Sequence, residues 1–414
     1  MKDKRIWTIY LSVALGGIIC FLFILLLDGV KAAEWLVMER NFNYQFTDHF
    51  RHLILVQDMK GLYRYPTDAT LPPLAYLFYR ILLQMDPTEY PMQLNSCFLM
   101  EFQEYQLLIF VVYLCFVTVL LFLAIKKQLR WIYSDTALLL VVVSVLLSAA
   151  MVSGAYERGN IALLTLLLLV LALYFKESES KGKRELALIL IAIAAGLKMY
   201  PAFLGLLYIK EKRWKEALRL VGYGLLCFFG PFVVMGGING LLMYIQVLRT
   251  TVEDPVLRFT NIGAYVPGVM ALFGGDMELG RLLGQVCEWL LLGGCLLAFW
   301  REEEQWKQVL YISMLMVLFV PKSYRYVAIY TLLPFLSWGR EKSKKGDIVY
   351  AVIFGLIFTI PFYGYLLPQF SVQNADGSIY ILPIADLYIF LPIYILLLWS
   401  WIHSIYSRKI KKRM

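Results

Sequence analysis

The chain has 414 residues, of which 60% are hydrophobic and 17% charged, and its mean hydropathy is +0.66. Soluble domains are nearer half apolar and a quarter charged, so this composition excludes an ordinary soluble protein and indicates a polytopic membrane protein. The net charge of +9 does not indicate nucleic-acid binding, because the basic residues lie in short loops between apolar segments, where they act as topology signals.

The first apolar segment, residues 6–27, follows a charged start and looks at first like a signal peptide. Signal peptides have apolar cores of only about 7–15 residues, whereas a helix needs roughly 20 to cross a bilayer. We therefore expect an uncleaved first helix and about ten full spans in all. The predicted spans are residues 6–27, 105–125, 135–152, 160–175, 217–235, 279–300, 307–320, 326–338, 348–366 and 383–402.

Two further apolar runs, residues 186–197 and 199–209, are each too short to cross alone. Lys198-Met199-Tyr200-Pro201 separates them, and proline removes a backbone donor and breaks a helix. Broken helices at membrane depth persist only where protein or a cavity covers them. We expect this pair to dip into the membrane and return.

Clusters of Lys and Arg in the loops place the N-terminus and the basic tail, residues 403–414, in the cytoplasm. The long first external loop, residues 28–104, then lies outside. The fold expected is all α, with one transmembrane domain over residues 1–414 that forms a helical bundle with broken half-helices. The other segments predicted to lie outside are residues 153–160, 236–278, 321–325 and 367–382.

The external loop carries many ionisable side chains, which are costly near a bilayer unless they serve a site. Asp48 is the leading candidate, because a carboxylate held at the membrane surface can act as a general base toward a sugar hydroxyl. The alternative is an ordinary helix cap or a solvated aspartate. Tyr63 is a candidate for stacking on a sugar ring, or it sits in the headgroup zone.

Cationic residues elsewhere on the predicted outer side are suited to phosphate. Arg158 offers a planar donor fork, or it forms an interfacial pair with Glu157. Asn160 begins a span, where a helix N-terminus favours an anion, or it is a plain N-cap. Lys198 calls for a phosphate or carboxylate partner, since its cost at mid-membrane is about 2.5–3.5 kcal/mol on insertion scales; the alternatives are a structural ion pair or a side chain that snorkels to the interface.

Lys322 and Arg325 flank Tyr324 at the outer start of a predicted span, where they capture phosphate or anchor the aromatic belt. The sequence contains no glycine-rich phosphate loop, no Cys/His metal spacing and no nucleophile elbow. We therefore expect neither a metal nor another cofactor, and no nucleic-acid partner.

Four stretches together resemble the membrane glycosyltransferases of the GT-C superfamily, and most closely glycosyltransferase family 87, the bacterial enzymes that use polyprenyl-phosphate sugars. The first joins Asp48-His49-Phe50, Lys60-Gly61-Leu62-Tyr63 and Leu71-Pro72-Pro73-Leu74. The second is Glu157-Arg158-Gly159-Asn160, and the third is Gly196-Leu197-Lys198-Met199-Tyr200-Pro201. The fourth runs from Pro321 to Tyr326. The chain departs from the family at the Gln of the second motif and at the His of the fourth.

The resemblance implies a GT-C-type bundle and an inverting hexosyltransferase that moves a sugar from a polyprenyl-phosphate-linked donor to a glycolipid or glycan acceptor. It also implies a multi-pass protein of the bacterial cytoplasmic membrane with its active site facing outside. Asp48 matches the family's catalytic base, and the donor phosphate is expected near Arg158, Lys198, Lys322 and Arg325. The substrate-binding candidates are Tyr63, Glu157, Asn160, Tyr200 and Tyr326.

Two other functions fit an apolar chain of this kind. A lipid-linked sugar flippase or transporter predicts inverted repeats and polar groups at the membrane midplane, whereas here the polar groups collect on one face and no repeat is visible. A non-catalytic assembly subunit predicts tolerance to the loss of Asp48, Arg158 and Lys198 together.

Overall fold

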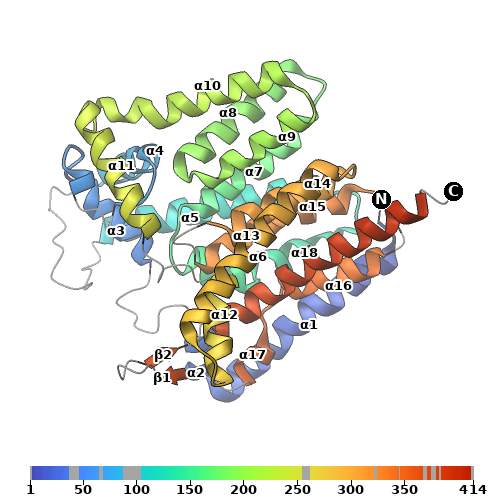
Figure 1. The fold of residues 1–414 in the computed structure, drawn as a ribbon. Helices are drawn as coiled ribbons and strands as arrows, with labels where there is room; N and C mark the ends of the chain where they lie inside the picture. The colour runs from blue at the N-terminus through green and yellow to red at the C-terminus, as the bar shows by residue number, and fades with distance from the viewer. Residues whose placement is uncertain are drawn as a thin grey trace. The chain divides into compact units, whose positions relative to one another are not determined.

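The structure, a computed structural model, is made almost entirely of helices (Figure 1). Its contacts divide it into two compact units: unit 1 comprises Met1–Val37, Lys126–Gly154 and Val256–Met414, and unit 2 comprises Met38–Ile125 and Ala155–Pro255. Both units combine segments that are distant in the sequence, and the single domain expected over residues 1–414 stays a prediction. The residues that the structure describes are 2–36, 46–64, 69–86, 104–253, 262–320, 324–344, 346–366, 371–373, 379–381 and 384–411.

Unit 2 holds two helices of the predicted first external loop, between residues 47 and 84, and the broken half-helices. Within it α7, α8 and α10 pack side by side. α8 also comes close to its neighbours at Gly196, where an added Cβ would lie 2.7 Å from the Leu74 side chain and 3.0 Å from Cys227 Cβ. Its elements are α3 (Thr47–Leu55), η2 (Leu62–Arg64), α4 (Pro73–Gln84), α5 (Glu104–Gln128, up to Ile125), α7 (Ala162–Lys176), α8 (Lys181–Leu197), η4 (Tyr200–Leu204), α9 (Gly205–Lys210), α10 (Trp214–Phe229), η5 (Gly230–Val233) and α11 (Gly237–Glu253).

The predicted break between the two half-helices is confirmed. α8 ends at Leu197, Lys198 adopts an extended conformation, and the short 3-10 helix η4 and then α9 follow. Pro201 stands near the start of η4, where its missing N–H is tolerated. The break therefore places Lys198 between helices, where its side chain is buried.

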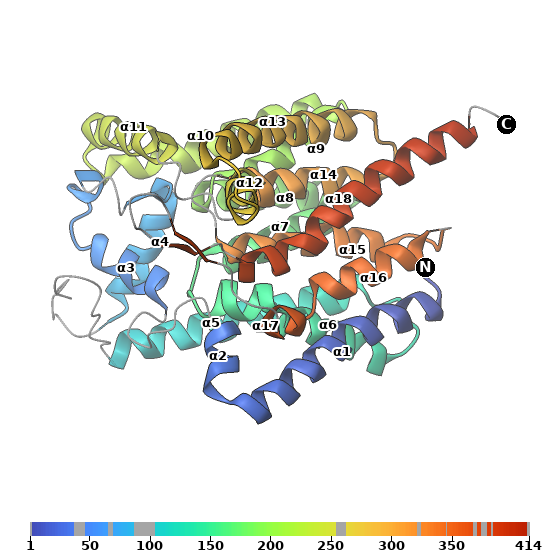
Figure 2. The same cartoon turned by 60° about the horizontal axis from the view of Figure 1, so that its bottom comes forward.

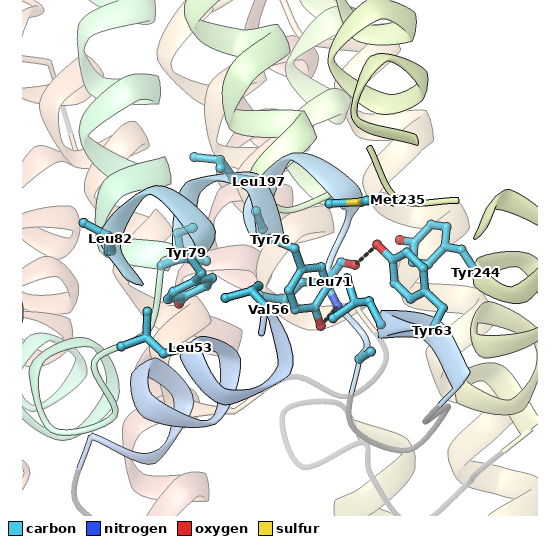
Figure 3. Close-up of a cluster of buried hydrophobic side chains, with 14 of the residues drawn as sticks. Leu53, Val56, Tyr63, Leu71, Tyr76, Tyr79, Leu82, Leu197, Met235 and Tyr244 are labelled. Carbon is cyan, nitrogen blue, oxygen red and sulfur yellow. Dashed lines mark hydrogen bonds between the residues drawn. The ribbon is translucent and has the colours of Figure 1, made fainter. Parts of the chain in front are cut away.

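A buried cluster of aromatic and aliphatic side chains joins α3, η2, α4, α8 and α11 in unit 2 (Figure 3). Tyr63 lies inside it, with its ring 4.8 Å from that of Tyr244 and 5.8 Å from that of Tyr76. The Tyr63 hydroxyl donates to the Leu71 carbonyl at 3.4 Å, and the Leu71 N–H donates to the Tyr76 hydroxyl at 3.2 Å. The cluster thus packs η2 and the start of α4 against one another, beside the helix that carries Asp48.

Unit 1 holds the N-terminal and C-terminal helices. α1 packs beside α16, and α16 beside α18, as both ribbon views show (Figures 1 and 2). β1 and β2 form a short antiparallel pair in which Val372 lies opposite Tyr380. The elements are α1 (Lys4–Asp28), α2 (Val30–Leu36), α6 (Asp135–Leu146), η3 (Ala150–Tyr156, up to Gly154), α12 (Ile262–Leu272), α13 (Met277–Arg301), α14 (Gln305–Leu318), η7 (Arg325–Thr331), α15 (Leu332–Arg340), α16 (Asp347–Ile357), α17 (Phe362–Leu366), β1 (Ser371–Gln373), β2 (Ile379–Ile381) and α18 (Ile384–Lys411).

In the part of the chain that the structure describes, five helices are long and apolar enough to cross a membrane, or up to six if α6 and η3 form one bent span. An all-α, multi-pass architecture fits this finding, but the predicted ten spans are not confirmed. Several apolar runs are interrupted helices: α6 and η3 meet at 49°, and the run 348–366 divides into α16 and α17, with Pro361 just before the second. Apolar character alone does not reveal such breaks. The five helices that are long and apolar enough to cross are Lys4–Asp28, Tyr105–Gln128, Trp214–Val233, Met277–Arg301 and Leu387–Tyr406.

Candidate active site

α3 carries Asp48 in its first turn and starts from a strained backbone position. Phe46, just before the helix, has φ 57° and ψ 21°, a left-handed conformation that is uncommon for any residue other than glycine. The Phe46 N–H donates to the carbonyl of Glu157 at 2.8 Å. This backbone hydrogen bond ties the start of α3 to the segment that precedes α7.

Asp48 is held by two side chains of that segment. Arg158 Nη2 donates to Asp48 Oδ1 at 2.5 Å, and Asn160 Nδ2 donates to Asp48 Oδ2 at 2.6 Å. The Asp48 side chain is 16% exposed and that of Arg158 12%. Asn160 also caps α7, because its Oδ1 accepts from the Ala162 N–H at 2.9 Å. One amide of Asn160 therefore contacts both Asp48 and the start of α7, and the substrate contact predicted for it stays a prediction.

Gly159 lets the two segments approach this closely. Its φ is +61°, and an added Cβ would lie 2.9 Å from Phe110 Cζ and 3.0 Å from His49 Cβ. A larger residue would face both a disfavoured backbone conformation and a clash. The glycine between Arg158 and Asn160 thus allows both side chains to reach one carboxylate.

The environment of Asp48 keeps it ionised. Burial on its own raises the pKa of this carboxyl, but the Arg158 charge and the Asn160 hydrogen bond together lower the pKa below its ordinary value. Asp48 is therefore a carboxylate at neutral pH, able to accept a proton but weakened as a base by its partners.

Lys198 is the second cation in this neighbourhood. It is buried, and its charge interacts favourably with that of Asp48. Unit 2 thus brings together three of the predicted residues, Asp48, Arg158 and Lys198, from three separate segments. Tyr200, two residues beyond Lys198, is buried at the start of η4.

Two histidines of α3 belong to this region and were not singled out from the sequence. His49 packs among aromatic rings, with centroids 4.4 Å from Phe110 and 5.6 Å from Tyr79. His52 lies one helical turn beyond Asp48, and its surroundings include the charges of Asp48, Lys198 and Arg51. The i to i+4 spacing of Asp48 and His52 is the signal that sequence reading could have used.

The remaining candidates lie in different surroundings. Tyr63 is buried in the aromatic cluster of unit 2, and Glu157 is also buried. Arg325 and Tyr326 are buried in unit 1, where Arg325 Nη1 donates to the Leu36 carbonyl at 3.0 Å. Lys322 lies outside the described residues. A single site that includes Arg325 stays a prediction.

No group of three or more His, Cys, Asp or Glu side chains able to hold a metal ion occurs among the residues that the structure describes. What unit 2 offers instead is an ionised carboxylate surrounded by cationic and amide donors. Such an arrangement can take a proton from a hydroxyl and stabilise an oxyanion or a phosphate.

A model of one protein family, Glycosyltransferase family 87, matches residues 70–321, which is more than half of the chain. The chain belongs to glycosyltransferase family 87. The resemblance to family 87 is thereby confirmed, and with it the assignment of the chain as a membrane glycosyltransferase. No curated protein and no solved structure matches the chain.

The family match covers part of the candidate site of this family 87 chain. Arg158, Asn160 and Lys198 fall inside the matched range, whereas Asp48 and Arg325 fall outside it. The geometry of unit 2 therefore connects Asp48 to residues that the family match covers.

Proposed function

We propose that the protein transfers a hexose or similar sugar from a polyprenyl-phosphate-linked donor to a glycolipid or cell-surface glycan, on the outer face of the bacterial cytoplasmic membrane. The observation that carries the proposal is the Asp48 carboxylate, bound by Arg158 and Asn160 and attracted by Lys198, in a family 87 chain. A GT-C-type bundle would let the lipid donor enter from the bilayer.

In the proposed reaction an acceptor hydroxyl oxygen attacks the anomeric carbon of the donor sugar. The bond from that carbon to the phosphate oxygen breaks, and the phosphate leaves with the electron pair. Asp48 takes the hydroxyl proton. A single displacement of this kind inverts the anomeric configuration. Holding both substrates in line supplies much of the rate.

Arg158 and Lys198 would stabilise the leaving phosphate by charge and hydrogen bonding. A phosphate that draws on Arg158 weakens its hold on Asp48. The pKa of Asp48 then rises, because less positive charge stabilises the carboxylate. Donor binding would thus make the carboxylate a better base at the moment when one is needed. Arg325 and Lys322 are proposed as further phosphate contacts.

The other candidate residues are proposed as substrate contacts. Asn160 already touches Asp48, and Glu157 is close to both through its backbone hydrogen bond to Phe46. Tyr200 follows Lys198 directly after Met199, and Tyr63 and Tyr326 would contact the sugar or the lipid. No metal or other cofactor is proposed.

The test is sugar transfer by the purified full chain in lipid nanodiscs, with a panel of polyprenyl-phosphate sugars and mass spectrometry of the products. Asp48→Asn should lower the transfer rate by about 10²–10⁴-fold, the usual range for losing a general base. Asp135→Asn is the matched control, because Asp135 is an exposed carboxylate at the start of α6. A folded Asp48→Asn protein with the wild-type rate removes Asp48 from this role. Translocation of the intact lipid-linked sugar without transfer supports a flippase instead.

A further inference from the structure

His52 of α3 is a buried histidine with an unsatisfied ring nitrogen. The side chain of His52 is 8% exposed, and its Nδ1 has no hydrogen-bond partner among the residues that the structure describes. Leaving a buried polar atom without a partner is costly, so native structures usually give such an atom a function or a ligand.

The charges around His52 indicate what kind of ligand would fit. On its own helix it faces Asp48, Arg51 and His49, and from the break after α8 it faces Lys198. The rings of Tyr76 and Tyr79, from α4, lie 5.5 Å and 5.1 Å from the imidazole. Of these charged neighbours Lys198 and Arg51 are cations, and the carboxylate of Asp48 is already paired with Arg158.

Cationic neighbours of this kind favour an anionic ligand over a further cation. Burial lowers the pKa of His52 to about 3; Lys198 and Arg51 act in the same direction, and the Asp48 charge opposes them. The ring is therefore neutral at neutral pH, a poor acceptor for a proton released at Asp48. A neutral imidazole still carries one N–H and can donate it to an anion.

We propose that His52 is a substrate-contacting residue, whose Nδ1–H donates a hydrogen bond to a phosphate oxygen of the lipid-linked donor beside Lys198. The inference rests on the proposed lipid-phosphate donor and adds to it a residue on the same helix as Asp48. One turn of α3 then presents the base and a phosphate donor together, which would fix the distance between the acceptor hydroxyl and the leaving group.

His49 provides a matched control on the same helix. It too is buried, and both of its ring nitrogens lack a hydrogen-bond partner among the described residues. Its surroundings differ, however, because burial alone lowers the pKa of His49 to about 3, with no charged neighbour contributing. A general effect of buried histidine would appear at both positions, whereas phosphate contact would appear at His52 alone.

The experiment uses the full chain labelled with ¹⁵N-histidine in lipid nanodiscs. The chain has only three histidines, so three imidazoles are observed. His403 serves as an internal reference, with its Nδ1 3.2 Å from the Tyr350 hydroxyl. Polyprenyl phosphate without a sugar is the probe. We expect its addition to shift the His52 Nδ1 resonance and to leave those of His49 and His403 in place.

Binding of the same probe to variants gives the second readout. His52→Phe should weaken binding about tenfold to a hundredfold, as expected for one hydrogen bond to a charged group, while His49→Phe stays within twofold of wild type. If the probe binds wild type but leaves the His52 resonance unchanged, the inference is wrong and the lipid-phosphate donor stands. If the probe does not bind the wild-type protein at all, the role of His52 and the proposed lipid-phosphate donor are both overturned. The resonance measurement needs no variant, so misfolding of His52→Phe cannot mask either outcome.

Discussion

Arg158 and Asp48, 110 residues apart in the chain, meet at 2.5 Å between Nη2 and Oδ1 in a largely buried ion pair. A buried pair is a weak contributor to net stability, because both groups lose hydration, but removing one partner leaves an uncompensated charge. The pair therefore fixes the position of the carboxylate more than it stabilises the fold.

The first prediction concerns this ion pair. Arg158→Met should destabilise the protein by about 3–5 kcal/mol, since it strands the Asp48 carboxylate in a buried position. It should also raise the pKa of Asp48, because the largest favourable charge is gone. Thermal unfolding in detergent micelles measures the first effect. The double variant Asp48→Asn with Arg158→Met should recover part of the loss, and a double variant as unstable as the sum of the singles would contradict the pairing.

The second prediction separates the two hydrogen bonds of Asn160. Asn160→Ser keeps an oxygen able to cap α7, but its shorter side chain does not reach Asp48. Asn160→Ala removes both contacts. Ala should therefore cost about 1 kcal/mol more in unfolding free energy than Ser, the usual value of an N-cap. Both variants should weaken sugar transfer alike, measured with the same nanodisc assay. Equal stability of the two variants would show that the Ala162 contact contributes little.

Some of this site could be predicted from the sequence. The break at Lys198 follows from Pro201 between two short apolar runs, and the structure confirms it. The meeting of Asp48 with Arg158 follows from assigning both to one membrane face. These features depend on local chemistry and on charge distribution, which the sequence displays directly.

Other features depend on contacts that the sequence does not display. The left-handed Phe46 is a residue with no preference for that conformation, so only the folded backbone reveals it. The predicted external loop 236–278 contains α11 and α12, although α12 carries an internal proline, Pro267. Apolar runs predict where a span lies, but the composition of a run does not distinguish a continuous helix from two helices at an angle.

The third prediction is a loss of stability on acidification. The pKa values of His49 and His52 are lowered to about 3 in the fold, against 6.5 for an ordinary histidine. Between these pKa values the unfolded chain binds more protons than the folded chain. The contribution of the two neutral histidines to stability is therefore fully present above about pH 6.5 and is lost as the pH drops toward 3. The contribution of Asp48, whose pKa is also lowered, is lost only at more acidic pH, below its ordinary value.

The size of this effect follows from linkage. Each histidine should lower the free energy of unfolding by about 2 kcal/mol at pH 5 relative to neutral pH. Thermal unfolding at pH 7 and pH 5 measures the total, and His49→Phe should reduce the difference between the two pH values by about 2 kcal/mol. If the His49→Phe protein shows the same pH difference as wild type, His49 does not remain neutral in the fold. The His403 contribution is common to both proteins and cancels in the comparison.

The fourth prediction concerns a close backbone approach in unit 1. At Gly154 an added Cβ would lie 2.8 Å from both Cα and N of Tyr326. Because these neighbours are backbone atoms, they cannot move away by a change of rotamer as a flexible side chain would. Gly154→Ala must therefore displace the start of η7. We expect a loss of about 1–3 kcal/mol in unfolding free energy, the usual cost of overpacking. Gly16→Ala in α1 is the matched control, since no atom lies within 4 Å of its added Cβ, and it should be neutral or stabilising by up to about 1 kcal/mol.

Because Arg325 stands directly before Tyr326, the Gly154→Ala variant should also weaken polyprenyl phosphate binding if Arg325 is a phosphate contact. Unchanged binding in a protein destabilised as expected would remove Arg325 from that role.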